Sequence, residues 1–176
     1  DSAAALSSDT YGISYQGKFG PVMANAAYAS QRDAGDNSND FSADYYNLEL
    51  GTKISSVTLL AGIESLGSDN GVGFSTPLAT LHKFQGFADK FLGTPGAGVE
   101  DIYITAKTKV SGVKLSATYH DLSSDAGSID YGSEIDIAAA YAINKNYNVL
   151  VKFASFNADD QGADTNKLWL QAAAKF

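Results

Sequence analysis

The chain has 176 residues, a formal net charge of −8 at pH 7, 17 glycines, 3 prolines and no cysteine. The lack of cysteine excludes disulfides and cysteine-ligated metals, and an acidic chain without a basic stripe argues against a nucleic-acid partner. No apolar run reaches the roughly 18 residues of a membrane-spanning helix. The first residues lack the pattern of a secretory signal, so we expect that the signal was removed or that an N-terminal part is missing.

Nine segments alternate apolar and polar residues, which is the pattern of β-strands with one apolar face. In chain order they are 11–19, 22–31, 44–54, 57–66, 101–110, 113–121, 133–143, 146–156 and 166–176. No charged side chain lies on the apolar face of any strand core, and each segment has the roughly ten residues of a tilted transmembrane strand. The final Phe176 resembles the C-terminal signature of bacterial outer-membrane barrels. The sequence therefore predicts an all-β fold, an antiparallel transmembrane β-barrel.

The connections alternate between tight turns and long polar loops. The turns are Gly20-Pro21, Ser55-Ser56, Ser111-Gly112 and Asn144-Lys145. The long loops cover about 32–43, 67–100, 122–132 and 157–165. Outer-membrane barrels have short periplasmic turns and long extracellular loops. We therefore expect a bacterial outer-membrane location, with the C-terminus in the periplasm and every long loop outside the cell.

The predicted strand number is odd, whereas bacterial single-chain barrels have an even number. We therefore expect residues 1–176 to be a single β-barrel domain or a fragment of one, the C-terminal portion of a larger barrel of about 16–18 strands. Its partners would be membrane lipid and either a missing N-terminal half or another chain that completes the barrel, with a homo-oligomer as a further option. A tenth strand within 67–100 is the alternative.

Alternation alone does not decide whether the apolar face meets lipid or a soluble core, as in a lipocalin-like ligand-binding barrel. Small residues on the polar face and the asymmetry of the loops favour lipid. Aromatic side chains also gather near the strand ends, as in the girdles at bilayer interfaces. Tyr11, Tyr28, Tyr46 and Tyr119 lie towards the long loops, and Phe19, Tyr141, Tyr147 and Phe176 lie towards the turns.

The polar side chains at alternate positions of the strands share one face, and this face carries more lysines than acids. If it points inward, the sequence predicts a basic lumen. The predicted pore-lining residues are Lys18, Lys53, Lys107, Lys109, Lys114, Lys152, Lys167, Glu49, Glu64, Glu134 and Asp136, with Lys175 on the same face. Rings of charged side chains set the ion preference of a confined pore, so we expect a channel for small anionic solutes or anionic saccharides. The alternatives are that lysines and acids pair across strands to stiffen the wall, or that lysines at the rim meet lipid headgroups.

The loop 67–100 holds a helix-start signal, with Thr76 as the N-cap and Pro77 at the first helical position. Leu81, Phe84 and Phe91 follow at helical spacing. We therefore predict a short helix at 76–92 on a long extracellular loop, folded into the pore, closing it as a lid or docked on a neighbour. The candidate constriction residues are His82, Lys83, Phe84, Phe87, Asp89, Lys90 and Phe91. The alternative is that the loop only connects adjacent strands.

Residues 76–103, with the core His-Lys-Phe-x-Gly-Phe-x-Asp-Lys-Phe at His82–Phe91, resemble a segment of the alginate-export family of outer-membrane porins. The resemblance implies a larger barrel with a basic lumen that passes an anionic polysaccharide, and with loops that obstruct the channel. The basic selectivity residues of that family are largely arginine. This chain has a single arginine, Arg32, and lysine in the other basic positions, and the two side chains recognise carboxylates differently.

The sequence gives little indication of catalytic or metal-binding chemistry. His82 and His120 are the only histidines, and a Ser-His-Asp arrangement of His120 with Ser116 or Asp121 is the kind of coincidence that a chain rich in serine and aspartate produces. The acidic loop 33–40 lacks the residue order of a calcium-binding EF-hand. We expect no enzyme, no metal and no cofactor.

Three functions therefore remain open at this point. The first is a passive outer-membrane channel that the loop at 76–92 constricts. The second is a plugged structural barrel whose loops bind a partner protein. The third is a soluble ligand-binding barrel.

Overall fold

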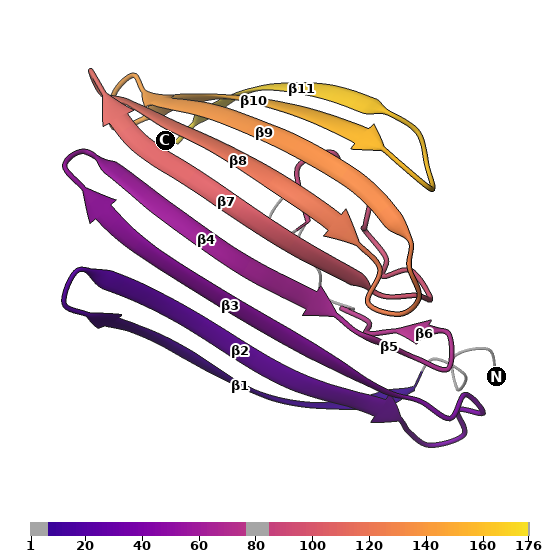
Figure 1. Cartoon of the computed structure of the whole chain (residues 1–176). Helices are drawn as coiled ribbons and strands as arrows, with labels where there is room; N and C mark the ends of the chain where they lie inside the picture. The colour runs from indigo at the N-terminus through magenta and orange to yellow at the C-terminus, as the bar shows by residue number, and fades with distance from the viewer. Residues whose placement is uncertain (1–6, 77–84, 176) are drawn as a thin grey trace.

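The computed structural model describes residues 7–76 and 85–175, and they form a curved antiparallel sheet of nine strands (Figure 1). The sheet order is β1-β2-β3-β4-β7-β8-β9-β10-β11. The strands are β1 (Ser8–Phe19), β2 (Val22–Asp33), β3 (Ser42–Ile54), β4 (Val57–Leu66), β7 (Val99–Val110), β8 (Val113–Ser123), β9 (Asp130–Ala142), β10 (Tyr147–Ala158) and β11 (Thr165–Ala174). Among the described residues, no helix has the length and apolar character needed to cross a membrane.

All nine predicted strands are confirmed, and each pairs with its neighbours in the chain. Several extend further towards the long loops than the alternation indicated: β1 begins at Ser8 and β9 at Asp130. The predicted alternative of a tenth strand within 67–100 is wrong for the described residues. Before β7 begins at Val99, the described part of that region holds only a two-stranded hairpin, β5 (Ser68–Asp69) and β6 (Val72–Gly73), outside the main sheet. β4 pairs directly with β7 across this loop.

The tight turns follow from backbone conformations that suit a two-residue hairpin. Ser111 (φ 48°) and Gly112 (φ 87°) join β7 to β8, and both have the positive φ that a type I′ turn requires. Ser55 (φ 56°) opens the equivalent turn between β3 and β4. Such turns fix the register of the strands that they join, and with it the face on which each side chain lies.

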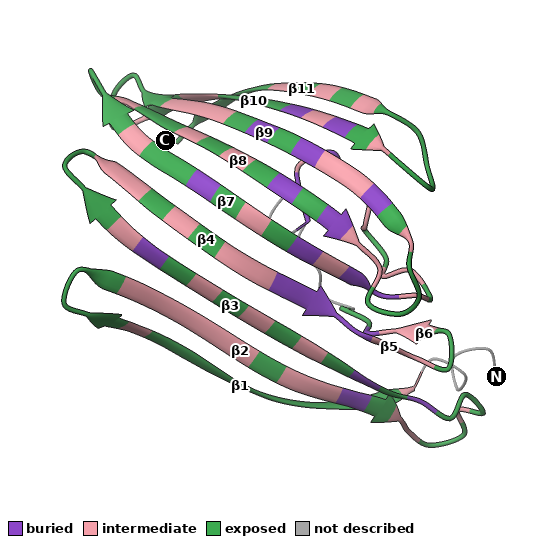
Figure 2. Cartoon of the chain, viewed as in Figure 1, coloured by how far each residue is buried: buried purple, intermediate pink, exposed green. Residues whose placement is uncertain are grey.

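The two faces of the sheet differ in composition, and exposed residues alternate with more buried ones along much of β3, β7, β8, β9 and β10 (Figure 2). The convex face carries exposed apolar side chains, such as Ile13 (76% exposed) and Leu170 (73% exposed). The aromatic residues predicted for the girdles are exposed as well: Tyr11, Tyr28, Tyr46, Tyr119, Phe19, Tyr141 and Tyr147. Phe176 lies outside the described residues. A lipocalin-like barrel would bury this apolar face, so the soluble-barrel alternative disagrees with the structure.

The buried apolar core is small and lies where the long loops fold against the concave face. Its larger members are Phe41, Leu66, Phe74, Val99, Leu122, Tyr131 and Phe156. β1 and β11 form the two edges of the sheet and do not pair with each other in the described residues, so the sheet is open. The concave face and the loop that covers it are therefore where a site can form.

Candidate functional site

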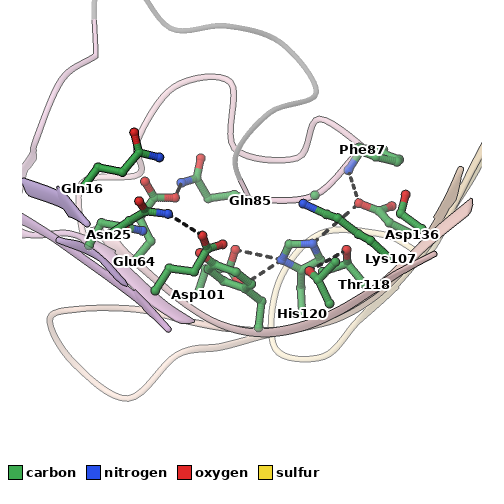
Figure 3. A pocket seen from close by; sticks show the side chains of 16 residues that line it. Gln16, Asn25, Glu64, Gln85, Phe87, Asp101, Lys107, Thr118, His120 and Asp136 are labelled. Atoms are coloured by element: carbon green, nitrogen blue, oxygen red, sulfur yellow. Dashed lines mark hydrogen bonds and ion pairs between the residues drawn. The ribbon is translucent and has the colours of Figure 1, made fainter. Parts of the chain in front are cut away.

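A cavity of about 600 Å³ lies between the concave face and residues 85–87 (Figure 3). These residues belong to the inward segment, which we define as residues 85–92 of the long loop. The polar side chains that line the cavity come from seven strands and from the inward segment: Gln16, Asn25, Asn47, Glu49, Glu64, Gln85, Asp101, Tyr103, Thr105, Lys107, Ser116, Thr118, His120 and Asp136. No group of three or more histidine or acidic side chains among the described residues has a geometry that could hold a metal ion.

Buried carboxylates of the sheet hold the inward segment. The backbone N–H of Phe87 donates to Asp136 Oδ2 (2.8 Å), and that of Ala88 donates to Glu134 Oε1 (2.6 Å). Gln85 Nε2 donates to Glu64 Oε2 (2.5 Å). Glu134 is fully buried, and Asp136 is 2% exposed. Hydrogen bonds to a carboxylate are stronger than those between neutral groups, so these contacts fix the backbone of the segment against β4 and β9.

The close approach of backbone to carboxylate depends on Gly86. Its φ is +86°, and a Cβ at this position would lie 2.5 Å from Glu134 Cδ. The neighbouring Gln85 (φ 50°) and Asp89 (φ 57°) also have left-handed backbone conformations. A side chain at position 86 would therefore displace either the segment or Glu134.

Lysines bind the other side of the inward segment. Lys167 Nζ donates to the carbonyl of Ala88 and lies 3.3 Å from Asp89 Oδ2. Lys152 Nζ lies 4.4 Å from the centre of the Phe87 ring, a cation–π contact. The Phe91 ring packs against Tyr131, with 5.1 Å between their centres.

The predicted helix at 76–92 is absent from its described part. Residues 85–92 form turns and bends, and residues 77–84 lie outside the described residues. The left-handed conformations of Gln85 and Asp89 break helical geometry, and sheet carboxylates take the N–H groups of Phe87 and Ala88. Of the candidate constriction residues, Phe87, Asp89, Lys90 and Phe91 belong to the inward segment. His82, Lys83 and Phe84 lie outside the described residues.

The structure adds residues that the sequence prediction missed. Asp101 is 1% exposed, and both of its carboxylate oxygens lie within 3.0 Å of His120 Nδ1. His120 Nε2 lies 3.6 Å from Asp136 Oδ2, so the histidine stands between two carboxylates (Figure 3). The aspartates that contact His120 are therefore Asp101 and Asp136, and not Asp121. Asp101, Tyr103 and Thr105 are alternate residues of one strand and therefore lie on the same face. This spacing could have placed Asp101 on the concave face.

Glu49 is the most accessible acid of the cavity wall, since it is half-buried rather than buried. It accepts hydrogen bonds from Asn25 Nδ2 (2.7 Å) and from the hydroxyl of Tyr103 (3.1 Å). Both partners are neutral, and no cation within the described residues forms an ion pair with Glu49.

The predicted pore-lining lysines fall into two groups. Lys152 and Lys167 contact the inward segment, as described above. Five others are exposed and form no ion pair in the described part of the chain: Lys18, Lys53, Lys107, Lys109 and Lys114. Four of these five line a second hollow of about 380 Å³. Lys109 and Lys114 are direct register partners, an arrangement of like charges that weakens a sheet. The described residues contain no cross-strand pair of any of these five lysines with an acid. Lys175 lies beyond the end of β11.

No protein-family model and no curated protein matches the chain. Among solved structures it is similar to Salmonella typhi OmpF in a complex with daunomycin, with a TM-score of 0.61 and 18% sequence identity. The fold is porin-like. The match covers 93% of this chain and 49% of that one, so the chain spans about half the length of the porin. The resemblance to the alginate-export family finds no support in these comparisons.

Replacing Gly86 with alanine should loosen the inward segment. The added Cβ meets the Glu134 carboxylate and forces an unfavourable φ, at a cost of about 1–3 kcal/mol. We expect faster hydrogen exchange at the Phe87 and Ala88 amides. Gly93→Ala is the matched control, because a Cβ there meets nothing within 4 Å. Equal exchange rates in the two variants would contradict the assignment of Gly86 as the point of closest approach.

Proposed function

We propose that this chain forms part of the wall of an outer-membrane channel, through which small solutes diffuse passively, and that the inward segment narrows the passage. One observation carries the proposal: the sheet has an exposed apolar convex face, while its concave face is polar, hollow and covered by its own loop. Non-helical backbone is tolerated at membrane depth only where protein buries it or where it lines a water-filled cavity. The inward segment meets this condition.

The membrane orientation that we propose follows the connections. The connections from β1 to β2, from β3 to β4 and from β7 to β8 have two residues each and would face the periplasm. The long loops would face outside the cell, as in other outer-membrane barrels. Lipid would then contact the convex face.

The channel also needs strands beyond the nine described here, because an open sheet edge is not stable in hydrocarbon. Strand direction alternates across the sheet, so β1 and β11 run the same way. Antiparallel closure therefore requires an odd number of further strands, about seven or nine for a barrel of 16–18. We propose that an N-terminal half or another chain supplies them, and a homo-oligomer of such barrels is compatible with this.

We further propose that the channel favours anionic solutes. The five exposed lysines without ion pairs support this preference, because charged rings in a confined pore raise the local concentration of counter-ions. The resemblance of residues 76–103 to the alginate-export family would extend the class to anionic saccharides.

The charge preference can be measured in planar bilayers with the whole barrel under a potassium chloride gradient. We expect a reversal potential that shows anion preference, and a smaller preference in the combined variant K53Q/K107Q/K109Q/K114Q. Lys145→Gln is the control, because Lys145 lies exposed in the turn between β9 and β10. Cation preference that the four substitutions leave unchanged would overturn the lysine argument.

A separate recording tests the inward segment as the constriction. Replacing residues 85–92 with a Gly/Ser linker of equal length should raise the single-channel conductance, because the segment occupies part of the lumen. The same replacement at 34–40, in the loop between β2 and β3, should leave the conductance unchanged. No conductance in any of these proteins would instead favour the plugged structural barrel.

A further inference from the structure

On the concave face, lysines and acids lie at different distances from the tight turns, with five lysines near the turns and the acids further away. Lys53 precedes Ser55 by two residues, and Lys107 precedes Ser111 by four. Lys18, Lys109 and Lys114 each lie two residues from a turn, counted to residues 20, 111 and 112. No acid of the concave face lies this close to a turn in the described chain.

The carboxylates of the same face stand further along the strands. Glu49 precedes Ser55 by six residues, and Asp101 precedes Ser111 by ten. Glu64 follows Ser56 by eight, while Asp136 and Glu134 precede Ile143 by seven and nine. At about 3.3 Å per residue, the carboxylates and the lysines occupy two successive levels of the wall. We call them the acidic level and the lysine level.

The acidic level contains one accessible acid without an ion-pair partner among the described residues, Glu49. Lys152 and Lys167 lie at this level, and the inward segment engages both. Glu49 has only neutral partners. Glu49 is therefore the accessible acid of this level that has no ion-pair partner among the described residues.

The two levels belong to adjoining hollows. Four acids of the acidic level line the cavity of about 600 Å³: Glu49, Glu64, Asp101 and Asp136. Four lysines of the lysine level line the hollow of about 380 Å³: Lys53, Lys107, Lys109 and Lys114. Lys107 and Ser116 line both, so the hollows meet at these two residues. A solute that passes along the wall therefore meets a negative and a positive environment in succession.

We propose that the channel selects zwitterionic solutes, short peptides above all, whose ammonium group lies at the acidic level while the carboxylate lies at the lysine level. Glu49 and Lys53 are four residues apart on β3, about 13 Å along the strand, which is the length of about four extended peptide residues. The amides of Asn25, Asn47 and Gln85 line the cavity and match the hydrogen-bonding groups of a peptide backbone. The inference rests on the proposed channel. It adds that the favoured solute carries a cationic group as well as the anionic group that the lysines attract.

The test uses four forms of tetraglycine that differ only in their end charges. They are the free peptide, the N-acetylated anion, the amidated cation and the doubly capped neutral form. Uptake of each radiolabelled form is measured in proteoliposomes that contain the whole barrel, at about 0.1 M salt, where charges remain effective over about 10 Å. We expect the free peptide to enter about fivefold faster than the neutral form, the size of effect that partly solvated charge pairs produce, and faster than either singly charged form.

Substitutions then separate the two levels. Glu49→Gln should remove the advantage of the free peptide over the N-acetylated form, and K53Q/K107Q should remove its advantage over the amidated form. Lys53 and Lys107 are exposed, so the lysine variant does not depend on refolding of a buried site. Asp159→Asn and Lys145→Gln are the controls, since both residues are exposed in connections outside the two hollows, and they should change nothing.

The outcomes distinguish this inference from the channel proposal. Fastest uptake of the N-acetylated anion would overturn the inference and leave the lysine preference intact. Equal uptake of all four forms, with measurable conductance, would overturn the inference and leave the channel. No uptake and no conductance would overturn the channel itself.

Discussion

Hydrogen bonding between neighbouring strands forces successive side chains to opposite sides of the sheet, and the rest of the structure depends on this constraint. On β7, Ile104 is 56% exposed while the adjacent Thr105 is 6% exposed. The same alternation across nine strands builds an apolar convex face and a polar concave face from one chain. A helix of this composition could not separate the two kinds of side chain so completely, because its period of 3.6 residues does not match theirs.

The concave face becomes a site only because the loop between β4 and β7 folds back onto it. Carboxylates are rarely buried unless they have partners, and here backbone N–H groups of the inward segment are those partners. The acids therefore position the segment, and the segment in turn encloses the cavity that they line. The lysines near the turns are exposed because no loop within the described residues covers them, so the two levels of charge remain separate.

Strands, turns and the uncharged face could be predicted because alternation and turn residues are local properties of the chain. The fold of residues 85–92 could not be predicted in this way. Leu81, Phe84 and Phe91 have helical spacing, but the groups that decide the conformation of Phe87 and Ala88 are carboxylates 49 and 46 residues away in sequence. The contacts of Lys152 and Lys167 with the inward segment could not be predicted for the same reason, since they join residues far apart in the sequence. Alternation along the predicted strand could also have placed Asp101 on the polar face. It was missed because the predicted strand begins at that residue.

We propose that the two faces of each strand meet lipid and water respectively. The chain suits a direct measurement of this arrangement because it has no native cysteine. Single cysteines at 113–119 on β8 can carry nitroxide labels in the whole barrel in lipid vesicles. We expect that oxygen reaches labels at 115, 117 and 119 more readily, and that a polar nickel reagent reaches labels at 114, 116 and 118 more readily. The opposite phase, or no alternation, would contradict it.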